Sequence, residues 1–518
     1  MAFRGANRRE KRSERALAPF ARDLMAPTGQ GSIVQWTVVG TVAIVLGIFT
    51  IGAASLPARW APLFIFAVLC PFIAMIVGNV RRLLLAIIIL DIPLQLDIHL
   101  GYRTEAAELG AIGGLGISVT TVCLVVLYAL WLAELLTKPM ESRWRLSLRT
   151  SLPLALYLTF VALSAVVARD VGLSIFKIFL LLQMFLLYLY VAAFVRTRQD
   201  VLFLVTMLFT GLVLEALLMI GLRYVGQDFS FAGISSRIDL GTGATAQFYR
   251  VAGTIGSPNT AASYLSLLLA PAISLLLTPL GRCYKWLAAL TFGLGGVALI
   301  LTLSRGGWLA FSLSIMAFCF LAWRRGWLSP SIPLVAAAAA MLVALLFHNA
   351  ILARLFGYDG GAALSRIPLM KLAFRMIMDN LVLGVGANNF SITLRQYLTP
   401  ELAGAWLYAV HSKYLLVWAE TGIGGFVAFI WFLLATIRRG WQCWKSGDRF
   451  LSPLALGFTA GIVGHMAHML VDTFQNRPLV QLLWLIAGLL AAMSLMDDNR
   501  ASDTTHSLEP KYSHSVKM

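Results

Sequence analysis

The feature that most limits the fold of this chain is a series of long apolar runs along nearly its whole length. About fourteen runs of roughly 17 to 25 residues, each long enough to cross a hydrocarbon core of about 30 Å, are separated by short polar gaps. They begin near residues 32, 61, 83, 112, 152, 173, 201, 260, 286, 307, 329, 413, 452 and 479. No gap can hold a soluble domain of ordinary size. The pattern predicts an all-α, polytopic bundle of about 14 transmembrane helices.

The composition agrees with a chain embedded in lipid. Hydrophobic residues make up 59% of the 518 residues and charged residues 13%, and the mean hydropathy is +0.81. Soluble domains carry about a quarter charged residues. The net charge of +17 would suggest nucleic acid in a soluble protein, but most Lys and Arg residues fall in short loops at the ends of apolar runs. No nucleic-acid partner is predicted.

These basic loops orient the predicted helices, because cytoplasmic loops are enriched in Lys and Arg. If residues 1–31 are cytoplasmic, every second loop lies on the cytoplasmic side, and each of these loops is basic. They lie at 81–82, 138–149, 196–198, 282–285, 324–325 and 438–449. We therefore predict a basic cytoplasmic segment (1–31), a transmembrane domain (32–497) and a polar cytoplasmic tail (498–518), with both termini in the cytoplasm.

Two stretches on the predicted outer side are longer than ordinary loops, roughly 223–258 and 349–411. Long loops in compact membrane proteins often carry function. Apolar residues of the second stretch are spaced as in an amphipathic helix at the membrane interface, namely Leu369, Leu372, Phe374, Met376 and Ile377. The third span is the weakest, because Asp91, Pro93 and Asp97 interrupt it, and it is either a full span or a broken or re-entrant helix.

Two arginines on the outer side are candidates for binding an anion. Arg305 lies between two apolar runs with almost no loop, so its guanidinium sits at membrane depth. Gly306 and Gly307, which follow it, allow a tight turn and a close approach to the backbone. Arg250 precedes a helix start that Asn259 can cap, and a helix N-terminus suits an anion. For Arg305, the alternative is a side chain that reaches the surface or pairs with a carboxylate. For Arg250, it is an ordinary helix cap with a solvated arginine.

His411 lies where the second long stretch re-enters the membrane, and its imidazole can take a proton from a hydroxyl near neutral pH. The alternative is a structural histidine. Glu420 lies deeper in the same run, where pairing with a basic residue is expected. The spacing of His465, His468 and Asp472 places them on one helix face, which suits either a metal site or, as we favour, an internal hydrogen-bond cluster.

Motifs for cofactors are missing from the sequence. It has no CxxC or other zinc-ligand spacing, no Gly-rich nucleotide-binding loop and no serine-centred nucleophile elbow. Neither a metal nor another cofactor is predicted, and the five cysteines predict no disulfide.

Several short motifs, taken together, resemble the O-antigen ligase and O-antigen polymerase superfamily. In chain order, the matching positions are Arg250 with Gly253-Thr254 and Pro258-Asn259, Thr302 to Gly307, Gly384-Val385-Gly386 with Phe390, and His411-Ser412 to Gly422 and Gly425. The resemblance covers about 200–480. It implies a GT-C-like membrane glycosyltransferase of the bacterial inner membrane, with its active site facing the periplasm.

The chemistry that this resemblance implies is a metal-independent, inverting transfer of glycan. The donor is an undecaprenyl-diphosphate-linked glycan, and the acceptor is a hydroxyl of a glycan or of a lipid A-core-type molecule. The resemblance makes Arg250 and Arg305 ligands of the diphosphate and His411 the base. Four further residues are candidate supporting groups: Arg366, Glu420, His468 and Asp472.

The sequence leaves several activities open. Ligases, polymerases of O-antigen or exopolysaccharide repeat units, and protein O-oligosaccharyltransferases share these motifs because they share the donor. A transporter of polyprenyl-linked glycans would also use outward arginines, but it predicts matching interrupted helices in two halves, which the sequence lacks. A scaffold protein would lose only stability on replacement of Arg305 or His411.

Overall fold

The structure is a computed structural model that describes residues 79–137, 148–231, 234–236, 238–240, 249–328, 366–398 and 407–508. The predicted spans near 32, 61 and 329 lie outside the described residues, as does the predicted basic segment 1–31. Of the predicted polar tail, residues 498–508 are described, and they continue the last helix.

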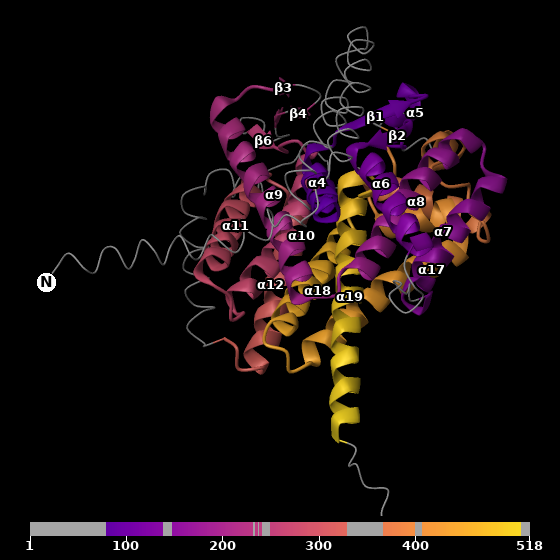
Figure 1. Cartoon of the computed structure of the whole chain (residues 1–518). Helices are drawn as coiled ribbons and strands as arrows, with labels where there is room; N and C mark the ends of the chain where they lie inside the picture. The colour runs from indigo at the N-terminus through magenta and orange to yellow at the C-terminus, as the bar shows by residue number, and fades with distance from the viewer. Residues whose placement is uncertain are drawn as a thin grey trace, which may run out of the picture.

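The described part of the chain is mostly helical, as predicted (Figure 1). The longer helices are α4 (Val80–Leu94), α6 (Val119–Thr137), α7 (Leu148–Ser164), α8 (Val171–Phe194), α9 (Arg198–Val225), α10 (Pro258–Leu276), α11 (Arg282–Leu301), α12 (Arg305–Arg324), α15 (Arg366–Asp379), α17 (Lys413–Lys445), α18 (Leu451–His468) and α19 (Arg477–Leu508). The short ones are α5 (Thr104–Glu108), η3 (Ala165–Val167), α16 (Phe390–Thr393) and η5 (Leu394–Tyr397).

Among the described residues, 8 helices are long and apolar enough to cross a membrane: α6, α8, α9, α10, α11, α12, α17 and α19 over Arg477–Asp497. Three other predicted spans are helices that are shorter or less apolar than these eight, namely α4, α7 and α18. The 15 residues of α4 measure about 22 Å, less than the hydrocarbon thickness. Eight of the predicted spans therefore have a full-length counterpart, and the total of fourteen stays a prediction.

The third predicted span is a short helix followed by a turn. Asn79 caps α4 by accepting a hydrogen bond from the Arg82 amide (3.2 Å), and Pro93 lies in its last turn. After Leu94 the chain turns at Gln95, whose φ of 51° is left-handed, and enters β1 (Asp97–Leu100). The helix is therefore broken near the interrupting residues noted in the sequence.

Short antiparallel strands gather at one end of the bundle (Figure 1). β1 pairs with β2 (Leu115–Ser118), β3 (Phe229–Phe231) pairs with β4 (Ile234–Ser236), and β5 (Ile238–Leu240) pairs with β6 (Tyr249–Val251). We call this the strand end. The basic connections between α8 and α9, between α10 and α11, and after α12 and α17 lie at the opposite end, so these loops share one end of the bundle.

The amphipathic helix predicted in the second long stretch is α15. Its apolar face buries Leu369, Leu372, Met376 and Ile377 against α17 and neighbouring segments. Phe374, which the prediction included in that face, instead points outward and is half exposed. The helix is confirmed, and its place relative to the membrane remains a prediction.

Helix α17 is broken at Gly422, whose φ of 66° and ψ of −172° are accessible to glycine alone. The break leaves backbone carbonyls of the preceding turn without their helical donors. The amide of Val385 donates to the Ala419 carbonyl (2.9 Å) and the amide of Gly386 to the Glu420 carbonyl (3.1 Å). The Gly384-Val385-Gly386 motif thus pairs with the break.

We expect Gly422→Ala to destabilise the fold strongly. A Cβ there would overlap the Val382 carbonyl oxygen, and the backbone conformation alone costs a non-glycine residue about 1–3 kcal/mol. The matched control is Gly296→Ala in α11, where a Cβ meets no atom within 4 Å. Thermal unfolding in detergent should show a large loss for the first variant and almost none for the second, and equal effects would contradict this account of the break.

Candidate functional site

The candidate residues come together at the strand end. Helices α10, α12, α17 and α19 begin there, and α18 ends there. Six of the seven residues lie at these helix ends or in the segments between them: Arg250 in β6, Arg305 at the start of α12, Arg366 at the start of α15, His411 before α17, His468 at the end of α18, and Asp472 after it. Glu420 lies within α17, away from this group.

A chain of hydrogen bonds joins Arg250 to Asp472. The Arg250 guanidinium donates to the Thr302 carbonyl (3.1 Å) and to Asn259 Oδ1 (3.1 Å), and Asn259 Nδ2 donates to Asp472 Oδ2 (2.9 Å). The prediction that Asn259 caps α10 is wrong, because Ser257 fills that role by accepting from the Thr260 amide (3.2 Å). Asn259 instead links the arginine to the carboxylate.

Arg305 is the half-buried first residue of α12. Ser304 caps the helix by accepting from the Gly307 amide (3.2 Å), and Leu303 before it has a left-handed φ of 51°. A Cβ at Gly306 would lie 2.7 Å from His468 Nε2. The close approach to the backbone predicted for this glycine is therefore made by His468, which places that imidazole beside Arg305.

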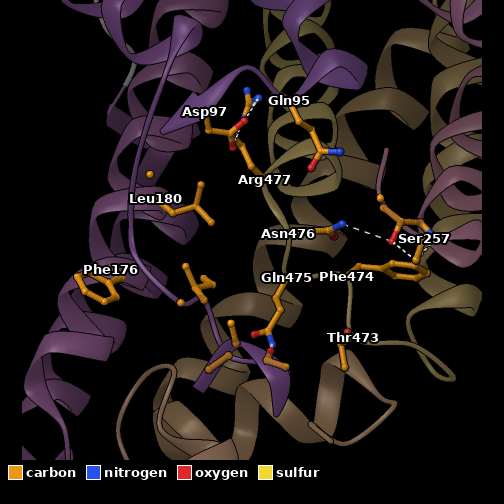
Figure 2. A pocket seen from close by; sticks show the side chains of 18 of the residues that line it. Gln95, Asp97, Phe176, Leu180, Ser257, Thr473, Phe474, Gln475, Asn476 and Arg477 are labelled. Atoms are coloured by element: carbon orange, nitrogen blue, oxygen red, sulfur yellow. Dashed lines mark hydrogen bonds and ion pairs between the residues drawn. The ribbon is translucent and has the colours of Figure 1, made fainter. Parts of the chain in front are cut away.

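His411, Asp472 and Asn259 line a cavity of about 730 Å³. In Figure 2, Thr473, Phe474, Gln475, Asn476 and Arg477 project from the segment that leads into α19. The His411 ring lies 5.6 Å from the ring of Tyr408. Its Nδ1 atom is buried and makes no hydrogen bond within the described part of the chain. A ring nitrogen is thus available for a proton.

The surroundings of His411 keep its imidazole neutral. Burial is the largest cause that lowers the pKa of His411 from its ordinary value, the positive charge of Arg366 lowers it further, and the negative charge of Asp472 raises it. The Arg366 guanidinium donates to the Val471 carbonyl (3.0 Å), one residue before Asp472. A histidine that is neutral at neutral pH can accept a proton.

These two charges predict opposite shifts in a pH profile. If neutral His411 is the active form, the rate rises with pH through the pKa of His411. Arg366→Gln removes a charge that lowers this pKa, so the acidic limb of log kcat/KM should move to higher pH. Asp472→Asn removes a charge that raises it, so the limb should move to lower pH. Shifts in the same direction, or no shift in either variant, would contradict this assignment.

Glu420 does not take part in the cavity. Its carboxylate forms a buried ion pair with Lys177 of α8, as the predicted pairing with a basic residue requires. Lys413, also buried, lies within electrostatic range of both groups. A supporting role for Glu420 is therefore structural, through the position of the broken helix that follows His411.

The histidines of α18 do not share a face with Asp472. The helix ends at His468, so Asp472 lies beyond it and the helical spacing used in the prediction does not apply. His465 Nδ1 is hydrogen-bonded to Ser263 Oγ (2.6 Å), whereas His468 packs edge-on against Phe474. No group of three or more His, Cys, Asp or Glu residues suited to a metal is found in the part of the chain that the structure describes.

Arg477, the first residue of α19, is held in a buried ion-pair cluster. Its guanidinium donates to Asp91 (2.7 Å) and Asp97 (3.0 Å), and also to Gln481 (2.9 Å). This cluster joins the start of α19 to the interrupted third span. The acids that interrupt that span in the sequence are therefore paired, and Asp97 and Arg477 of the cluster line the cavity.

One comparison with known proteins found a match to part of the chain. Residues 290–430 match the family model described as O-Antigen ligase. The match supports the O-antigen ligase and polymerase superfamily. It covers Arg305, Arg366, His411 and Glu420 and ends before His468, whereas Arg250 lies ahead of it. No curated protein matches the chain. The match supports the interpretation of the chain as a glycosyltransferase-like membrane enzyme of glycan biosynthesis.

Proposed function

We propose that the chain transfers glycan from an undecaprenyl-diphosphate carrier to an acceptor hydroxyl, at the outer face of the bacterial inner membrane. The observation that carries the proposal is the buried Nδ1 of His411, which makes no hydrogen bond within the described residues and belongs to a cavity of about 730 Å³. Arg250 is tied to that cavity through Asn259 and Asp472. The basic connections between helices lie at the end of the bundle opposite this cavity, which supports a cavity that faces outward.

In the proposed reaction, the acceptor oxygen attacks the anomeric carbon of the donor sugar while its proton moves to His411. The bond from the anomeric carbon to the phosphate oxygen breaks, and its electron pair leaves with the carrier diphosphate. Arg250 and Arg305 stabilise the charge that develops there, with a contribution from the N-terminus of α12. Attack opposite the leaving group inverts the anomeric centre. No metal or other cofactor takes part in this scheme.

Supporting residues position these groups. Burial lowers the pKa of His411 most, and Arg366 and Asp472 shift this pKa further in opposite directions. His468 contacts the backbone beside Arg305, and Glu420 fixes α17 through Lys177. The second candidate, polymerisation of O-antigen or exopolysaccharide repeats, uses the same residues and differs in the acceptor.

A transporter of lipid-linked glycan is less well supported. Among the described helices, α17 alone contains a non-helical residue inside it. Transporters of the inverted-repeat class carry such breaks in corresponding helices of two halves. Movement of donor across vesicles without formation of a glycosidic bond would nevertheless favour that activity over transfer.

The test of the proposed function is transfer by the purified full chain, with undecaprenyl-diphosphate-linked glycan and an acceptor glycan. Product should form with inverted anomeric configuration. We expect Arg250→Gln to lower kcat/KM for the donor about 10- to 100-fold, the loss typical of a hydrogen bond to a charged group. The matched control is Arg324→Gln, an exposed arginine at the opposite end of the bundle. Absence of product from the unaltered chain, or equal losses in both variants, would contradict the proposal.

A further inference from the structure

A second cavity, of about 660 Å³, lies beside the one that contains His411. The two cavities share a wall, because α5 and the turn after it supply Ala106 and Leu109 to the second and Ala107 and Gly110 to the first. None of the residues assigned to the reaction above lines the second cavity. Its charged lining residues are Arg103, Glu105, Arg169, Asp170 and Arg395.

The second cavity contains more cationic groups than its carboxylates neutralise. Arg103 forms an ion pair with Asp170. Arg169 and Arg395 form no ion pair with any carboxylate of the described residues, and both are exposed. Guanidinium groups present planar sets of N–H donors that match phosphate oxygens. The cavity therefore offers two available guanidinium groups to an anion.

Buried hydrogen bonds fix the backbone that presents Arg169. Asn389 is fully buried, its Oδ1 accepts from the Asp170 amide (2.8 Å), and its Nδ2 donates to the Asp170 carbonyl (3.0 Å). The hydroxyl of Ser391, in the short helix α16 that precedes Arg395, donates to the Leu109 carbonyl (2.8 Å). The two arginines therefore come from segments anchored to the same wall, although they are far apart in sequence.

The same wall holds the segment that carries His411. The Leu109 carbonyl also accepts from the amide of Ala409 (3.0 Å), two residues before His411. Asn388, next to Asn389, exchanges hydrogen bonds with the backbone of Ile112 (2.8 and 2.9 Å), which lines the first cavity. A ligand bound at Arg169 and Arg395 would thus lie one hydrogen-bonded wall away from the proposed base.

We propose that the second cavity binds a phosphate group of the acceptor through Arg169 and Arg395, and so orients the acceptor hydroxyl toward His411. The acceptor role rests on the proposed function, whereas phosphate binding itself does not. Phosphate chemistry has two sources here, a phosphorylated glycan or the headgroup of an anionic phospholipid. Phosphate binding is measured without turnover, so a failure of this proposal can be distinguished from a failure of the proposed transfer reaction.

The experiment measures how fast phenylglyoxal modifies each arginine, by peptide mass spectrometry of the full chain in phosphatidylcholine nanodiscs. Inorganic phosphate at several times its Kd occupies most copies of the site. Modification of Arg169 and Arg395 should therefore be slowed about fivefold. Arg324, exposed at the opposite end, is the matched control and should react at an unchanged rate. The protection should persist in Arg250→Gln, because that arginine does not line the second cavity.

A second arm replaces part of the phosphatidylcholine with phosphatidylglycerol and adds no phosphate. Protection by inorganic phosphate alone supports a phosphorylated acceptor. Protection by the anionic lipid alone overturns the acceptor role and assigns the cavity to a headgroup. Absence of protection in both arms, or equal protection of Arg324, overturns the site altogether, whether or not the chain transfers glycan.

Discussion

Replacement of His411 by Ala is expected to lower the rate of glycan transfer about 100- to 10,000-fold, the usual contribution of a positioned general base. In the proposed reaction, the imidazole takes the proton of the acceptor hydroxyl. Its Nδ1 makes no hydrogen bond within the described residues. Single-turnover kinetics with saturating donor and acceptor measure this effect directly, because they report the transfer step without product release.

The companion variant His411→Gln separates proton transfer from packing. Glutamine fills much of the space beside Tyr408 and keeps a polar end, but it cannot accept a proton at neutral pH. We expect a rate as low as that of His411→Ala, with thermal unfolding close to that of the unaltered protein. A His411→Gln variant that retains most of the activity would show that the histidine is structural.

Replacement of Glu420 by Gln is expected to cause the largest loss of stability. The carboxylate pairs with Lys177 in a buried position, and Lys413 lies within range of the same charge. Removal of one member of a buried pair costs about 3–5 kcal/mol, because the remaining charge is left without compensation. Glu420→Gln leaves two buried lysine side chains without their carboxylate. Unfolding in detergent and the yield of folded protein measure this loss.

The matched variant Lys177→Met should be milder. It removes one cation but leaves the Glu420 carboxylate with Lys413, so a compensating charge remains. The double variant Lys177→Met with Glu420→Gln should lose less stability than Glu420→Gln alone and more than Lys177→Met alone. The reason is that a single buried charge remains. Equal losses in the two single variants would show that Lys413 does not share this charge.

Periodic and local features could be predicted from the sequence. Apolar runs predicted helices such as α8, α9 and α12, whose bounds lie close to the expected starts, because run length and hydropathy depend on neighbouring residues alone. The glycine motif after Arg305 predicted a close approach, and a histidine makes it. The amphipathic pattern of the second long stretch predicted α15.

Partners that are distant in sequence could not be predicted. Lys177 is a single charge within an apolar run, and no local feature of the sequence indicates that it pairs with Glu420. Asn259 looked like a cap because local spacing favours one, but the neighbouring Ser257 took that role and freed the amide for Arg250 and Asp472. The helix ends at His468 because the chain turns toward α19, which no periodicity shows.

The measurement that tests the central claim most directly is the carrier-linked glycan pool, separated by length, in cells whose sole copy is His411→Ala at normal expression. Our account predicts that carrier-linked glycan accumulates while surface glycan is lost. Long carrier-linked chains would indicate a ligase, and single carrier-linked repeats would indicate a polymerase. An unaltered pool with intact surface glycan would contradict the assignment of glycan transfer to this chain.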